Sequence, residues 1–138
     1  DGQVGWDWFG LQLDDGAELM VYALRMADGS AHPLSEGVLV DATGSRRALA
    51  WGTDIEVRGT GRWTSPLDGT VYPSGWSIRV PAAGLELDVE PAIPDQELNL
   101  AFRYWEGSVR VAGTAAGRPV AGRGYVELTG YAGRLPER

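Results

Sequence analysis

Glycine-containing turns divide this chain into short alternating segments, and this pattern restricts the fold more than any other feature. The 138 residues include 20 Gly, which usually stand beside Asp, Ser or Thr. Between these clusters, Val, Leu, Trp and Tyr alternate with polar residues, as is typical of antiparallel strands joined by tight turns. No segment has a convincing helical period of 3.6 residues. The sequence therefore predicts an all-β domain.

The first two predicted strands, residues 4–13 and 17–26, form a hairpin whose register follows from its turn. A three-residue turn with a bulge places Phe9 opposite Val21 and Asp7 opposite Ala23, with Arg25 one diagonal step from Asp7. The other face of this hairpin carries a second set of largely apolar side chains: Trp6, Trp8, Met20, Tyr22 and Leu24. Because both faces are apolar, we expect one to line an interior and the other to pack under a loop or partner.

The remaining strands complete an antiparallel barrel. We expect them at residues 37–41, 46–51, 54–63, 76–81, 85–90, 98–105 or 98–107, 108–114 and 120–131, with 64–75 irregular. About nine or ten short strands with no substantial helix favour closure, because closure removes exposed sheet edges. A barrel of this size can hold one small apolar ligand. Residues 1–134 are expected to form this single domain, and residues 135–138 a tail.

The composition excludes several function classes. A net charge of −7 without a basic cluster argues against nucleic-acid binding. All cations are Arg, Cys is absent and His32 is the single histidine, which excludes a lysine Schiff base, a thiol nucleophile and a zinc site of several imidazoles. No apolar run is long enough to span a membrane, and we expect neither a metal nor a cofactor. The first residue is Asp1 rather than Met, which is expected of a processed chain, an artificial boundary or a fragment.

Three carboxylates lie among aromatic residues and are the main proton donors available. They are Asp7, Glu106 and Glu127. Glu106 shares a strand face with Tyr104, and the face that carries Glu127 has these further members: Arg123, Tyr125, Thr129 and Tyr131. These faces either point to solvent, where ion pairs stabilise little, or place at least one carboxylate inside with a shifted pKa.

Six Trp residues are many for a chain of this length. Trp6 and Trp8 flank Asp7, Trp76 follows Ser74-Gly75, and Trp105 precedes Glu106. Such residues either fill a barrel core or line a pocket for a flat or extended apolar ligand.

An ordered series of motifs resembles the second half of the carotenoid 1,2-hydratase and AttH-like family. The series begins with Gly5-Trp6-Asp7-Trp8-Phe9, Leu11 to Gly16, Glu18-Leu19-Met20 and Arg25, and it continues with Trp63 to Pro66, Tyr72-Pro73, Gly75-Trp76, Val80-Pro81, Gln96 to Leu98, Tyr104 to Gly107 and Gly122 to Tyr131. The resemblance implies a lipocalin-like barrel with an apolar ligand pocket. It also implies an N-terminal lipocalin-like half as a partner in tandem, and a secreted or periplasmic location.

The resemblance implies apolar polyene or polyketide-like ligands, and with the residues above it leaves two classes of function open. The first is a binding domain for an apolar polyene, isoprenoid or polyketide-like molecule. The alternative is an enzyme: either a hydratase, a hydro-lyase that adds water to a carbon–carbon double bond after protonation by a carboxylic acid, or a pericyclase of the Diels–Alderase type. The catalytic candidates are Glu106 and Asp7, and the ligand-binding candidates are Trp6, Trp8, Met20, Tyr22, Trp76, Tyr104, Tyr125 and Glu127.

Overall fold

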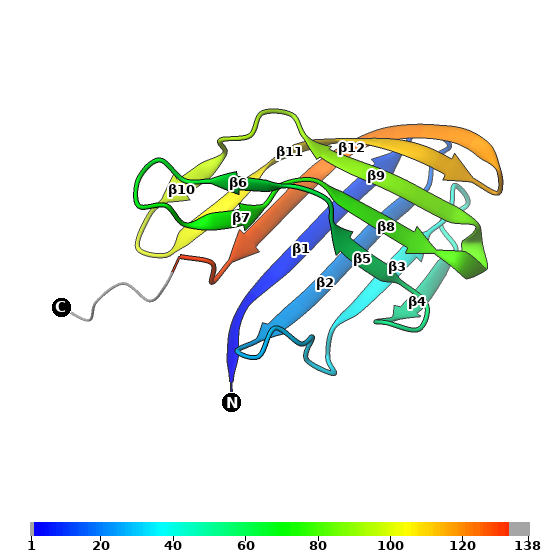
Figure 1. Cartoon of the computed structure of the whole chain (residues 1–138). Helices are drawn as coiled ribbons and strands as arrows, with labels where there is room; N and C mark the ends of the chain where they lie inside the picture. The colour runs from blue at the N-terminus through cyan, green and yellow to red at the C-terminus, as the bar shows by residue number, and fades with distance from the viewer. Residues whose placement is uncertain (1, 133–138) are drawn as a thin grey trace.

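The computed structural model describes residues 2–132 as an almost entirely β structure (Figure 1). One short 3-10 turn, η1, spans Pro81–Ala83. The strands are β1 (Gln3–Leu13), β2 (Glu18–Met26), β3 (Glu36–Val40), β4 (Arg46–Ala50), β5 (Glu56–Gly59), β6 (Arg62–Thr64), β7 (Val71–Pro73), β8 (Trp76–Val80), β9 (Leu85–Pro91), β10 (Glu97–Asn99), β11 (Arg103–Ala115) and β12 (Arg118–Thr129). No helix within residues 2–132 has the length and apolarity needed to cross a membrane. The tail expected at residues 135–138 lies outside the described residues.

Ten strands form one antiparallel sheet that curls on itself. Its order is β4-β3-β2-β1-β12-β11-β9-β8-β5, with β10 added to β11, and β6 and β7 form a separate hairpin. Figure 1 shows β8 and β5 lying across the interior from β1, β2 and β3. The end strands β4 and β5 are joined through an isolated bridge between Trp51 and Ile55 rather than a ladder. The predicted all-β architecture is confirmed, but the closure expected from the sequence is incomplete, and the sheet is a half-barrel.

The register predicted for the first hairpin is confirmed. Phe9 pairs with Val21 and Asp7 with Ala23. Since side chains alternate between faces along a strand, this register fixes which residues enter the interior. Phe9 and Val21 are fully buried, whereas Trp8 on the opposite face is half-buried.

The prediction of one strand at residues 54–63, followed by an irregular stretch at 64–75, is wrong. The first range contains β5 and most of β6, and the second contains β7. The chain leaves the main sheet at Gly59, and its continuation pairs as β6 with β7 in the separate hairpin. Two backbone hydrogen bonds, from Thr60 N to Gly75 O and from Ser74 N to Gly61 O, hold the crossing point. A local alternation cannot distinguish one bent strand from two strands in different sheets.

The strands predicted to begin at residues 98 and 108 are divided differently in the structure. Residues 98 and 99 belong to β10, residues 100–102 connect it to β11, and β11 runs without a break from Arg103 to Ala115. Gly107 does not end it, because Gly107 pairs with Val126 inside the ladder. The side chain of Gln96 lies over this glycine, donating to Ser108 O at 3.0 Å and accepting from Ser108 N at 2.8 Å. The Gln96 amide, from the β9–β10 loop, therefore occupies the space that a side chain at residue 107 would fill. The pairing of β11 with β12 continues through Gly107.

Aromatic side chains form the centre of the core. Trp105 is fully buried and donates its Nε1 hydrogen to Pro94 O at 2.8 Å. Its ring lies 6.0 Å from that of Trp76, which in turn packs edge-on against Phe9 at 5.4 Å. These contacts join the two walls of the sheet. Burying one such side chain stabilises the fold by about 1.5–3 kcal/mol.

Candidate functional site

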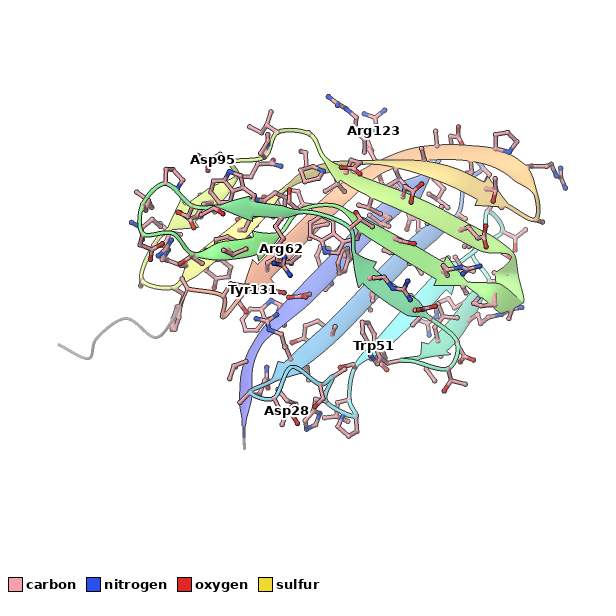
Figure 2. All side chains as sticks on the ribbon, viewed as in Figure 1. Asp28, Trp51, Arg62, Asp95, Arg123 and Tyr131 are labelled. Carbon is pink, nitrogen blue, oxygen red and sulfur yellow. The ribbon has the colours of Figure 1, made fainter. Side chains whose placement is uncertain are left out.

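A pocket opens at one end of the half-barrel, between β1–β2 and β5–β8. Its volume is about 180 Å³, and its walls are mainly apolar: Phe9, Ala23, Trp51, Val57, Pro73 and Trp76. Two charged side chains, Asp7 and Arg25, reach its wall together with Tyr131. In Figure 2, Trp51 and Tyr131 lie between the walls of the curled sheet. An apolar cavity with a few convergent polar groups is the usual form of a small-molecule site.

Asp7 is held by two donors on the pocket wall. Arg25 Nη1 lies 2.5 Å from Asp7 Oδ1, and the Tyr131 hydroxyl donates to Oδ2 at 2.9 Å. Only about a fifth of each charged side chain is exposed, 21% for Asp7 and 18% for Arg25. Burial raises the pKa of Asp7 above its ordinary value, although the charge of Arg25 and the hydrogen bonds from Tyr131 and Arg25 oppose the rise.

Arg25 has partners other than Asp7. Its Nη2 donates to the backbone oxygen of Thr129 at 2.5 Å, and its Cζ lies 3.8 Å from the centroid of the Tyr131 ring. A carbonyl oxygen and an aromatic face both stabilise a guanidinium ion. If Asp7 takes up a proton, Arg25 loses its carboxylate partner but keeps these two contacts.

Tyr131 reaches this site because the chain turns sharply after β12. The sequence pattern placed Tyr131 on one face with Tyr125 and Glu127, and that placement is wrong. The strand ends at Thr129, and Gly130 adopts a left-handed φ of 75°. A Cβ on Gly130 would also overlap the backbone oxygen of Val4, so glycine is required here and the turn directs Tyr131 inward.

Gly5 is the second position where a side chain would disrupt the site. A Cβ there would overlap Thr129 O and lie 2.8 Å from Arg25 Nη2. We expect Gly5→Ala to lower the free energy of unfolding in urea by about 1–3 kcal/mol, because the added methyl group forces β1 away from β12. The matched control is Gly59→Ala, whose Cβ would have its nearest neighbour at 3.6 Å and should change stability by no more than about 0.5 kcal/mol. Equal stability of both variants would contradict this close approach.

Most of the ligand-binding candidates derived from the sequence lie on the outer face of the sheet. Of the candidates, Asp7 and Trp76 line the pocket. The others are partly exposed on the side of β1, β2, β11 and β12 that faces away from the core: Trp6, Trp8, Met20, Tyr22, Tyr104, Glu106, Tyr125 and Glu127. A role for these residues in binding therefore requires a ligand or partner on the outer face.

Glu106 and Glu127 stand directly opposite each other on that outer face. Trp6 Nε1 donates to Glu127 Oε1 at 2.6 Å. Burial and the neighbouring Glu127 carboxylate raise the pKa of Glu106. Both carboxylates keep access to solvent, so of the three acids only Asp7 is in the pocket.

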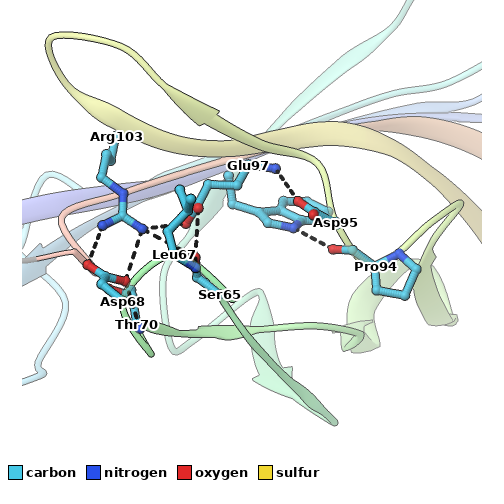
Figure 3. A network of polar contacts seen from close by, with 9 residues as sticks. Ser65, Leu67, Asp68, Thr70, Pro94, Asp95, Glu97 and Arg103 are labelled. Atoms are coloured by element: carbon cyan, nitrogen blue, oxygen red, sulfur yellow. Dashed lines mark hydrogen bonds and ion pairs between the residues drawn. The ribbon is translucent and has the colours of Figure 1, made fainter.

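A polar network fixes the β6–β7 hairpin across the end of the half-barrel (Figure 3). Arg103 of β11 binds Glu97 at 2.8 Å and Asp68 at 2.5 and 3.2 Å, and Ser65 donates to Glu97 at 2.8 Å. Tyr72 of the same hairpin is fully buried and packs against Tyr131 with ring centroids 5.6 Å apart. The network therefore holds the hairpin whose aromatic face supports Tyr131, and through it Asp7.

The sequence contains signals for only part of this site. The diagonal position of Arg25 relative to Asp7 follows from the hairpin register. Trp51, Val57 and Pro73 are not among the candidates. Trp51 lies in a connection and Pro73 at the end of β7, and Val57 faces the pocket from a predicted strand whose packing no local pattern reveals. The Gly130-Tyr131 pair is the one missed signal, since a glycine directly after an alternating run often marks the end of the strand.

Comparisons with known proteins agree with this fold. The model of the AttH-like family matches residues 1–131. The chain belongs to the AttH-like family. A crystal structure described as AttH from Nitrosomonas europaea is 35% identical to it, with a TM-score of 0.81 over 94% of this chain. The crystal structure of kievitone hydratase from Nectria haematococca is 19% identical, with a TM-score of 0.75 over 92% of this chain. No curated protein sequence matches.

The family and fold predicted from the residues are thus confirmed, and the half-barrel is a lipocalin-like fold. The chain covers 39% of the length of each of the two solved structures. Any N-terminal half in tandem, and the activity of such a longer protein, remain proposals for this chain.

Proposed function

We propose that this domain binds an apolar small molecule, such as an isoprenoid or polyene, with one end of the molecule inserted into the pocket beside Asp7. The observation that carries this proposal is the chemistry of the pocket wall, where aromatic and aliphatic side chains lie beside the Asp7–Arg25 ion pair and the Tyr131 hydroxyl. A volume of about 180 Å³ suits the end of a chain-like molecule better than its whole length. The rest of the ligand would then extend out of the open end.

Alkene hydration is the second candidate function, and Asp7 is the observation that favours it. Protonating an isolated double bond requires a carboxylic acid that keeps its proton, and burial raises the pKa of Asp7 in that direction. The Asp7 proton would form a new C–H bond at one alkene carbon and leave a carbocation at the other, which the face of Trp76 can stabilise. Water would add to the cation, and its released proton would return to the Asp7 carboxylate. One solved structure of the same fold is that of kievitone hydratase. Its name supports hydration as a candidate, and hydration by the present chain is our proposal.

Filling the pocket tests the binding proposal. Val57 lines it from β5 and is half-buried, so we expect Val57→Trp to occupy the cavity at little cost to folding. Binding of geraniol, measured by isothermal titration calorimetry, should weaken at least about tenfold, equivalent to about 1.4 kcal/mol.

The matched control for this variant is Val71→Trp. Val71 is 46% exposed on β7 and does not line the pocket, so this variant should bind geraniol as the wild type does. Equal affinities for the Val57→Trp and Val71→Trp variants would place the ligand elsewhere on the molecule. A wild-type chain that binds neither geraniol nor longer isoprenoids would refute the proposal itself.

A further inference from the structure

The outer face of β11 and β12 carries charges in an unfavourable arrangement. Three successive cross-strand pairs point outward on these two strands: Glu106 with Glu127, Ser108 with Tyr125, and Arg110 with Arg123. We call these three pairs the outer ladder. Like charges placed directly opposite each other in an antiparallel pair are destabilising. The ladder contains two such pairs, one acidic (Glu106 with Glu127) and one basic (Arg110 with Arg123).

The isolated chain does little to compensate these charges. Among residues 2–132, neither Arg110 nor Arg123 forms an ion pair, and the two glutamates form none either. Glu90 of β9 stands opposite Arg110, but no ion pair joins them. Figure 2 shows Arg123 projecting away from the sheet. The two guanidinium groups are therefore available to a partner.

The spacing of the ladder makes it self-complementary. The acidic and basic pairs are four residues apart along each strand, or about 13 Å at about 3.3 Å per residue. In a face-to-face pair, the outer ladder of a second copy lies against that of the first. The two copies are related by a two-fold axis that lies between the two sheets, perpendicular to the strands, and passes over the Ser108–Tyr125 pair. This rotation reverses the strand direction, so the acidic pair of each copy lies over the basic pair of the other. Glu127 then faces Arg123, and Glu106 faces Arg110.

We propose that the outer ladder is a self-association surface on which a second copy of this chain docks face to face. The inference rests on the charge pattern and does not depend on the proposed ligand or reaction. A two-fold contact of this kind uses the same surface patch on both subunits. Tyr125, 42% exposed, would lie at its centre, and half-buried Trp8, Met20 and Tyr22 would flank it. Tyr, Trp, Met and Arg are the residue types enriched at such interfaces.

Reversing the charges tests the proposal by sedimentation velocity. The wild-type chain at about 0.1 mM and low ionic strength should be dimeric and should dissociate as added salt screens the ion pairs. The acid-reversed variant (Glu106→Arg with Glu127→Arg) and the base-reversed variant (Arg110→Glu with Arg123→Glu) should each be monomeric. An equimolar mixture of the two should form a heterodimer, because the four arginines on the ladder of one variant then face the four glutamates on the ladder of the other.

The control is a double reversal of the exposed Arg79–Glu86 ion pair, which lies outside the ladder and should leave the dimer intact. If a reversed variant does not fold by circular dichroism, Tyr125→Ala provides the second measurement, and it should weaken the dimer at least about tenfold. A monomeric wild-type chain at low salt would overturn the proposal and leave this face to another domain. A mixture that stays monomeric, or an unchanged Tyr125→Ala dimer, would overturn it as well.

Discussion

Asp7→Asn is expected to reduce hydration of an acyclic isoprenoid at least about 100-fold while the protein still binds the same molecule. An asparagine at this position still offers an amide to the Tyr131 hydroxyl but has no proton to transfer to an alkene carbon. Loss of a positioned general acid typically costs about 10²–10⁴ in rate. Arg25 keeps Thr129 O and the Tyr131 ring as partners, so the pocket should retain its shape.

The measurement is the formation of the tertiary alcohol from geraniol in ¹⁸O-labelled water, followed by mass spectrometry, with affinity measured in parallel. The matched control is Asp88→Asn, an exposed carboxylate on β9 that does not line the pocket, and it should hydrate at the wild-type rate. Glu106→Gln separates the two acids predicted from the sequence. If it abolished turnover while Asp7→Asn did not, the proton donor would lie on the outer face.

The pH dependence of the rate provides an independent check on Asp7. The acid form is the reactive one, so the rate should fall as pH rises through the pKa of Asp7. Because burial places that pKa above the ordinary value of the residue, the fall should occur at higher pH than for an exposed aspartate. A rate that is independent of pH across the acidic range would argue against Asp7 as the donor.

The sequence predicts those features that follow from local alternation. In the first hairpin, the two-residue period and the turn length determine the register, and from it the proximity of Asp7 to Arg25. The strands at residues 76–81 and 85–90 are predicted for the same reason, and in the structure Gly84 adopts a left-handed conformation between them.

Features that depend on contacts between distant segments could not be predicted. Alternation makes Glu106 as good a catalytic candidate as Asp7, and Glu127 a ligand-binding candidate, because it shows which residues share a face but not which face is inside. That choice depends on the opposing wall, where Trp105, Val126 and Leu128 meet Trp76 and the other buried residues of β8 and β9. Similarly, Pro73 reaches the pocket from the β6–β7 hairpin and Trp51 from the connection between β4 and β5, so neither position follows from a local pattern.

Arg103→Met is expected to destabilise the fold by about 3–5 kcal/mol at neutral pH. Glu97 is only 4% exposed and Arg103 only 10%, so the substitution leaves a buried carboxylate without its cation. Removing one partner of a buried ion pair has a cost of this size. The exposed pair of Arg79 and Glu86 supplies the control, since Arg79→Met should cost at most about 1 kcal/mol. Urea denaturation at several pH values measures both variants.

Acidification should narrow the difference between the wild type and Arg103→Met. Burial acts to raise the pKa of Glu97, but the hydrogen bonds from Arg103 and Ser65 outweigh it and hold the pKa below its ordinary value. A carboxylate with a lowered folded-state pKa stabilises the protein above its unfolded-state pKa, and this contribution is lost as pH falls through the folded value. In the variant, burial without Arg103 raises the pKa instead, so protonation of Glu97 relieves the destabilisation. A difference that stayed constant down to about pH 3 would show that Arg103 does not stabilise the fold through the charge of Glu97.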